Sequence, residues 1–273
     1  MTILSEMFAG LREENRAALV GYLPAGFPDL AGSKDLFAAI AEGGPAGGCD
    51  LVEVGLPFSD PVLDGPSVQH AAGQALANGF RVRDTFEIVE SVTSRGGRAV
   101  VMTYFNPVLA YGVEAFARDL AAAGGAGVIT PDLIVDEAGP WLDAVHAHDL
   151  DPIFLVAPSS SVERIALTTA QGGGFVYAAS VMGVTGAREQ VSTAAPDLVA
   201  RCRTVTDLPI GVGLGVRTGE QARQIAEYAD AVIVGSAFLD AYARGGRNAL
   251  AALAGELAAG VRSADRRLPA RIN

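Results

Sequence analysis

Three carboxylates fall in the segment 52–66, which reads VEVGLPFSDPVLDGP. Glu53 interrupts an apolar run with the composition of a buried strand, where a charge costs free energy unless it is paired, neutralised or used. Asp60 and Asp64 follow in a proline-rich loop, which lowers the cost of holding a carboxylate in one pose. Aspartate is also an ordinary turn residue, so these two have a structural alternative. The segment predicts acid–base chemistry centred on Glu53, with Asp64 as the candidate second acid.

Eight β-rich runs recur along the chain, each followed by a turn and a helical pattern, at 273/8 or about 34 residues per unit. This length fits one strand, one helix and two loops. The pattern predicts an α/β fold, a (β/α)8 TIM barrel, in one domain over 1–262 with an extra N-terminal helix and a frayed tail over 263–273. A doubly wound open sheet is the alternative, which the repeat length alone does not exclude. The runs are 18–22, 51–54, 99–102, 127–129, 152–156, 175–177, 209–212 and 231–234.

The strand that carries Glu53 must present it to the inside of the barrel for it to act. Side chains alternate between the two faces of a strand, so Glu53 shares a face with Leu51, and Val52 shares the other with Val54. If the valines pack against helices, Glu53 points into the barrel mouth. Active-site groups of such barrels lie at the carboxyl ends of the strands.

Glycine-rich segments follow the sixth, seventh and eighth predicted strands. They are Gly183-Val184-Thr185-Gly186, Gly211-Val212-Gly213-Leu214-Gly215-Val216 and Gly235-Ser236-Ala237. Each run alone could serve an ordinary turn. Loops after the seventh and eighth strands often form a barrel's phosphate site, because exposed amides and a helix dipole favour an anion. Together they predict a phosphorylated ligand.

The charge and the cysteine content of the chain bear on its binding partners and on its location. The formal charge of −11 argues against nucleic-acid and anionic-membrane surfaces, which favour basic patches. Neither an export signal nor an apolar run of membrane-spanning length is evident, and Cys49 and Cys202 read as free thiols, so we expect a cytoplasmic protein. Three scattered histidines and two distant cysteines give no metal-ligand spacing.

Taken together, these residues resemble the family of tryptophan synthase alpha subunits. The segment from Val52 to Pro66, with Gln69, is close to the family's signature. Further support comes from Tyr104-Phe105-Asn106-Pro107, Pro131-Asp132-Leu133 and the three glycine-rich segments, so the resemblance covers nearly the whole chain. It implies a lyase of tryptophan biosynthesis that cleaves indole-3-glycerol phosphate into indole and D-glyceraldehyde 3-phosphate.

The resemblance also implies roles for individual residues. Glu53 would transfer protons and Asp64 would accept the indole N–H. Tyr22, Tyr104, Tyr177 and Thr185 would line the substrate pocket, and Gly186, Gly213, Leu214, Gly215, Gly235 and Ser236 would hold the phosphate. Two departures from the family pattern bear on loop closure: Leu214 replaces an aromatic residue of many relatives, and the segment 178–182 lacks a basic residue found in some.

The resemblance further implies a partner, a beta subunit that carries pyridoxal phosphate and receives the indole, in an alpha2-beta2 complex. This chain itself would hold no cofactor. Asp60, Pro61, Asn106 and Pro107 would lie in the loops that contact the partner. Two rival readings remain: another barrel enzyme acting on a phosphorylated sugar or precursor, and a non-catalytic chain that only activates a beta subunit.

Overall fold

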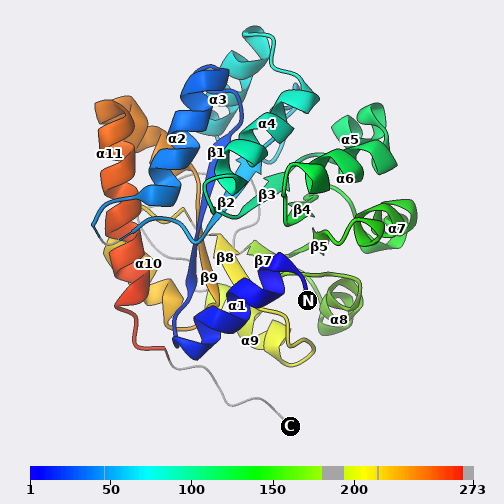
Figure 1. The fold of residues 1–273 in the computed structure, drawn as a ribbon. Coiled ribbons are helices and arrows are strands. Elements are labelled where there is room, and N and C mark those ends of the chain that lie inside the picture. Colours follow the sequence, from blue (N-terminus) through cyan, green and yellow to red (C-terminus); the bar gives the residue numbers. More distant parts are fainter. Residues whose placement is uncertain (46, 180–193, 214, 267–273) are drawn as a thin grey trace.

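The computed structural model describes residues 1–45, 47–179, 194–213 and 215–266. Parallel strands occupy its centre and helices surround them (Figure 1). The strands are β1 (Ala18–Pro24), β2 (Leu51–Gly55), β3 (Ala99–Met102), β4 (Gly127–Ile129), β5 (Asp151–Ile153), β6 (Leu155–Val156), β7 (Val176–Ala179), β8 (Ile210–Gly213) and β9 (Ala231–Val234). The helices are α1 (Ile3–Glu13), α2 (Leu30–Glu42), α3 (Pro66–Ala77), α4 (Val82–Thr93), α5 (Phe105–Tyr111), α6 (Val113–Ala122), the 3-10 helix η1 (Val135–Glu137), α7 (Gly139–Ala147), α8 (Val162–Ala170), α9 (Ala194–Arg203), α10 (Gly219–Ala226) and α11 (Ser236–Arg262).

The sheet closes on itself through a strand that is divided in two. The strand order is β5-β4-β3-β2-β1-β9-β8-β7-β6, and each neighbouring pair is parallel. β5 and β6 are separated only by Phe154, whose carbonyl accepts a hydrogen bond from the Tyr177 N–H at 3.1 Å. Because β5 pairs with β4 and β6 with β7, the two halves together complete the ring. The predicted (β/α)8 barrel is confirmed, and the open sheet is excluded.

Alternation along the strands divides the core into an inner and an outer part. Leu51 and Val100 belong to the cluster inside the barrel. Val52 and Val54 belong to the cluster between the strands and the helices. The valines of β2 therefore pack against helices, as the sequence predicted, and Glu53 shares the inner face with Leu51.

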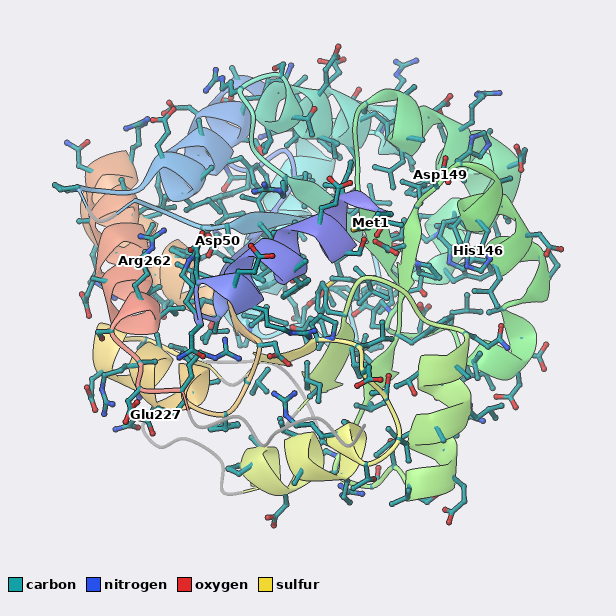
Figure 2. The ribbon with its side chains drawn as sticks, turned by 60° about the horizontal axis from the view of Figure 1, so that its bottom comes forward. Met1, Asp50, His146, Asp149, Glu227 and Arg262 are labelled. Atoms are coloured by element: carbon teal, nitrogen blue, oxygen red, sulfur yellow. The ribbon has the colours of Figure 1, made fainter. Side chains whose placement is uncertain are left out.

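The predicted extra N-terminal helix is α1, and it covers the amino-terminal end of the barrel. Figure 2, with the bottom of the molecule turned forward, shows α1 running across the middle of the ring of helices. Thr2 begins the helix, its side chain accepting a hydrogen bond from the Ser5 N–H at 3.2 Å. The apolar face of α1 joins the inner core, where the rings of Phe8 and Phe175 lie 5.8 Å apart. With this end of the barrel covered, the opposite end is left for a ligand.

The chain after α11 returns to the barrel. The Arg266 side chain is 3% exposed and its guanidinium lies 2.9 Å from Asp230 Oδ1. Arg203 binds the other oxygen of the same carboxylate at 3.0 Å. Asp230 directly precedes β9 and accepts a hydrogen bond from the Ile210 N–H of β8 at 3.0 Å, so this ion-pair cluster ties residue 266 to the starts of two strands.

Candidate active site

Glu53 is an acid buried inside the barrel. It lies on β2, opposite Tyr22 of β1 and Val100 of β3 in the strand register, and is 1% exposed. Neither carboxylate oxygen has a hydrogen-bond partner among the described residues. Burial, reinforced by the charge of Asp64, raises the pKa of Glu53 to about 8. At neutral pH its carboxyl group is therefore mostly protonated and can donate a proton.

Asp64 lies in the loop between β2 and α3, and hydrogen bonds fix that loop. The Asp64 N–H donates to the Pro61 carbonyl at 3.1 Å, and Gln69 Nε2 donates to the Asp64 carbonyl at 2.8 Å. Burial raises the pKa of Asp64 to about 6, and a hydrogen bond from Tyr104 acts in the opposite direction. Asp64 is mostly ionised at neutral pH, while Glu53 is mostly neutral. Two acids held in opposite protonation states can serve different steps of one reaction.

Two tyrosines share the barrel interior with these acids. Burial, followed by the charges of Glu53 and Asp64, raises the pKa of both Tyr22 and Tyr177, so both phenols stay protonated. Glycines make room for the rings: a Cβ at Gly55 would lie 2.5 Å from Tyr22 Oη, and one at Gly213 would lie 2.8 Å from Tyr177 Oη. The structure thus brings four predicted site residues, Tyr22, Glu53, Asp64 and Tyr177, close enough together for their charges to interact.

Tyr104 joins the loop after β3 to the loop that carries Asp64. Its hydroxyl accepts a hydrogen bond from the Leu63 N–H at 2.9 Å and donates to Asp64 Oδ2 at 3.4 Å. Phe58 stacks on the Tyr104 ring, with centroids 5.0 Å apart and planes inclined by 29°. Sequence reasoning gave Phe58 no role of its own, because an aromatic residue in a loop carries no signal of which ring it will meet.

The predicted phosphate residues are described only in part. Gly186 and Leu214 lie outside the described residues, as does Thr185, which was predicted to line the substrate pocket. Gly213 ends β8, and Gly215 follows with φ 64°, a left-handed conformation that favours glycine. Gly235 precedes α11 and Ser236 is its first residue, where backbone N–H groups have no partner within the helix. A Cβ at Gly235 would lie 3.1 Å from Tyr22 Cδ1, so this helix start lies against the ring of Tyr22.

Three exposed apolar side chains lie on the segments that follow β2, β3 and β4, one of them on helix α5. Val62, Leu109 and Ile134 are 72%, 57% and 54% exposed. They follow β2, β3 and β4, three neighbouring strands whose carboxyl ends lie side by side. Asp60 is exposed in the first of these segments, where it accepts a hydrogen bond from Ser59 Oγ at 2.7 Å. Such a concentration on one rim is typical of a protein–protein contact.

Other ligand classes find little support in the described part of the chain. No group of three or more histidine, cysteine or acidic side chains is arranged there to bind a metal ion. None of the helices described combines the length and apolar character that crossing a bilayer requires.

The fold and the site define a (β/α)8-barrel enzyme with a neutral and an ionised acid at the carboxyl-terminal mouth of the barrel. The family model of the tryptophan synthase alpha chain matches residues 8–263. The chain is 61% identical to the tryptophan synthase alpha chain of Mycolicibacterium paratuberculosis over 95% of its own length and 94% of that protein. It is 62% identical to that of Nocardia farcinica over 96% of both chains. A tryptophan synthase structure from Mycobacterium tuberculosis superposes with a TM-score of 0.90, at 59% identity, covering 96% of this chain and 98% of the other. The chain belongs to the tryptophan synthase alpha chain family.

Proposed function

We propose that this chain is a carbon–carbon lyase that cleaves indole-3-glycerol phosphate into indole and D-glyceraldehyde 3-phosphate, a step of tryptophan biosynthesis. Membership of the tryptophan synthase alpha chain family supports the reaction. The observation that carries the assignment to residues is the buried Glu53 carboxyl, unpaired among the described residues and adjacent to Asp64. An acid held in this way is costly for folding and suited to proton transfer.

The reaction is a retro-aldol cleavage, and its steps fit the two protonation states. The neutral Glu53 donates a proton to the indole carbon that bears the side chain, which places positive charge on the ring. Asp64, ionised, accepts a hydrogen bond from the indole N–H and stabilises that charge. Glu53, now a carboxylate, removes the proton of the side-chain hydroxyl. The carbon–carbon bond then breaks, its electrons return to the ring, and indole and the aldehyde form.

The remaining predicted residues would bind the two ends of the substrate. We assign Tyr22, Tyr104 and Tyr177 to the indole and glycerol pocket, together with Thr185. The amides of Gly213, Gly215, Gly235 and Ser236, with Gly186 and Leu214, would hold the phosphate. The start of α11 supports this assignment, because unpaired N–H groups and the helix dipole favour an anion there.

The beta subunit of tryptophan synthase is the partner, in an alpha2-beta2 complex, and Val62, Leu109 and Ile134 form a surface suited to it. Asp60 and Pro61 lie in the same loop as Val62, whereas Asn106 and Pro107 lie in helix α5 with Leu109 rather than in a loop, and all four would contribute contacts. Pyridoxal phosphate is associated with the beta subunit, and we infer that this chain binds no cofactor of its own. Free thiols at Cys49 and Cys202 support a cytoplasmic location.

The deciding experiment is indole release from indole-3-glycerol phosphate by the purified chain and by its Glu53→Gln variant. General acid–base catalysis is typically worth ~10²–10⁴-fold, so the variant should lose at least about 100-fold in kcat. Its affinity for glyceraldehyde 3-phosphate, measured by calorimetry, should stay within about twofold, because the phosphate contacts lie elsewhere.

Three results would count against the proposal. A parent chain that releases no indole, alone or with beta subunit, would leave another phosphorylated substrate. A parent chain that only stimulates a beta subunit would be a non-catalytic activator. A Glu53→Gln variant with nearly parental turnover would remove Glu53 as the acid.

A further inference from the structure

Asp240 joins the start of helix α3 to the loop between β8 and α10. It lies on α11, one helical turn after Ser236. Its Oδ1 accepts a hydrogen bond from Ser67 Oγ at 3.2 Å, and its Oδ2 lies 3.3 Å from a terminal nitrogen of Arg217. Ser67 is in the first turn of α3, and Arg217 is in the loop between β8 and α10. One carboxylate therefore holds three segments that are far apart in the sequence.

Each of these segments carries part of the proposed site. Asp64 comes three residues before Ser67, in the loop whose polar contacts were described above. Gly215 comes two residues before Arg217. Gly235 and Ser236 open the helix on which Asp240 itself lies. The acid loop and the loops assigned to phosphate thus meet at Asp240.

The loop after β8 has a further anchor beside this contact. The Arg217 N–H donates to Gln221 Oε1 at 2.8 Å, and the Thr218 side chain begins α10 by accepting a hydrogen bond from the Gln221 N–H at 3.2 Å. Gln221 therefore fixes the Arg217 backbone relative to α10. The Arg217 side chain then connects that fixed loop to α11, and Ser67 connects α11 to α3.

We propose that Asp240 is a positioning residue that fixes the spacing between Asp64 and the phosphate-binding loops. The inference rests on the function proposed above, in which one substrate molecule places its indole at Asp64 and its phosphate at the loop after β8 and the start of α11. The cleavage of a substrate held at both ends depends on the distance between its two binding sites, because a small displacement of the reacting groups lowers the reaction rate. Asp240 touches neither end of the substrate and acts through Ser67 and Arg217.

The ion pair between Arg217 and Asp240 is partly exposed to solvent. A positioning role can therefore be distinguished from a role in folding stability. The Arg217 and Asp240 side chains are 47% and 29% exposed, and ion pairs of this kind add little to folding stability. Loss of the pair should leave the unfolding midpoint nearly unchanged. We therefore expect loss of the pair to change the rate of cleavage rather than the stability of the fold.

Asp240→Ala should lower kcat/KM for indole-3-glycerol phosphate two- to fivefold, mainly through kcat. Its affinity for glyceraldehyde 3-phosphate, measured by calorimetry, should stay within about twofold of the parent. Asp240→Asn keeps an oxygen for Ser67 but loses the charge facing Arg217, so it should recover part of the loss. Asp35→Ala is the matched control, since Asp35 pairs with Arg247 at 2.9 Å and joins α2 to α11 without touching these loops. It should behave as the parent.

A double-mutant cycle tests whether the effect passes through Asp240. Ser67→Ala and Arg217→Gln should each lower kcat in the parent and should cost nothing further in the Asp240→Ala background. Three results would overturn the inference: kinetics of Asp240→Ala equal to those of the parent, an equal loss of activity in Asp35→Ala, or a loss of affinity for glyceraldehyde 3-phosphate in Asp240→Ala. In each case, indole release by the parent would still support the proposed function. A parent that releases no indole would overturn both.

Discussion

At the scale of single residues, Glu53 and Asp64 differ because their surroundings differ. Glu53 sits inside a closed barrel, where burial removes the water that would stabilise its charge. Asp64 sits on a loop at the barrel mouth and has a hydroxyl donor in Tyr104. The same chemical group is therefore neutral in one position and ionised in the other, and both chemistry and stability should depend on pH.

The raised pKa of Glu53 predicts that stability falls as pH rises. The folded chain keeps this proton up to about pH 8, whereas an unfolded glutamate loses it near pH 4.5. Between these values the folded state binds more protons, so the free energy of unfolding should decrease by about 1.4 kcal/mol per pH unit from this group, and level off above pH 8. Urea unfolding of the parent and of Glu53→Gln at pH 5 and pH 9 measures the difference. The variant should gain stability relative to the parent at pH 9; an equal difference at both pH values would contradict the assignment.

The Tyr104–Asp64 contact predicts a change in the activity profile. With Asp64 required as the anion and Glu53 as the acid, kcat/KM should be bell-shaped, with limbs near pH 6 and pH 8. Tyr104→Phe removes the donor that holds the pKa of Asp64 down, so the acidic limb should move to higher pH. The basic limb should stay in place. The measurement is indole release across pH 5–9, and an unmoved acidic limb would show that this contact does not tune Asp64.

At the scale of elements, α1 determines which end of the barrel is open. Met7, Phe8 and Leu11 are each nearly buried against the inner core, and the helix covers the starts of the strands (Figure 2). The candidate site lies at the opposite ends of the same strands. A helix that closes one end thus contributes to stability without entering the chemistry.

Phe8→Ala should destabilise the chain by about 3–5 kcal/mol, the usual cost of removing a buried phenylalanine. The loss has two sources, the apolar area no longer buried and the cavity left beside Phe175. Ile3→Ala is the control on the same helix, because Ile3 is 44% exposed, and it should change the unfolding free energy by less than about 1 kcal/mol. Urea midpoints measured at equal m-value give both numbers. Equal costs for the two variants would mean that α1 does not cover the core as described.

At the scale of the whole molecule, the proposed chemistry and the proposed partner contact fall at the same end of the barrel. The exposed apolar residues Val62, Leu109 and Ile134 follow three neighbouring strands, the first of which carries Glu53. The loop after β2 carries both Asp60, which is exposed, and Asp64, which is partly buried beside Tyr104. If the proposed function holds, we expect binding of a beta subunit to act on the loop that carries Asp64, because Asp60 lies in the same loop.

Asp60→Ala and Asp64→Ala should accordingly fail in different ways. Asp64→Ala should lower kcat with or without beta subunit, because it removes a contact made mainly in the transition state. Asp60→Ala should keep the slow cleavage of the isolated chain and lose the stimulation gained on adding beta subunit. Indole release by each variant, alone and titrated with beta subunit, is the measurement. An Asp60→Ala chain that is inactive alone, or an Asp64→Ala chain restored by the partner, would refute this division of roles.

The sequence by itself determined the barrel, the face on which Glu53 lies and the loop that carries Asp64, because strand alternation and proline-rich turns are local properties of the chain. Tertiary structure alone decided that one strand is split at Phe154, that Phe58 meets Tyr104, that Gly55 makes room for Tyr22, and that Asp240 joins Ser67 to Arg217. These contacts link positions distant in sequence, and no local propensity encodes which side chains meet when the ring closes. The pKa difference between two similar carboxyl groups arises in the same way, since it depends on the burial that the closed barrel creates.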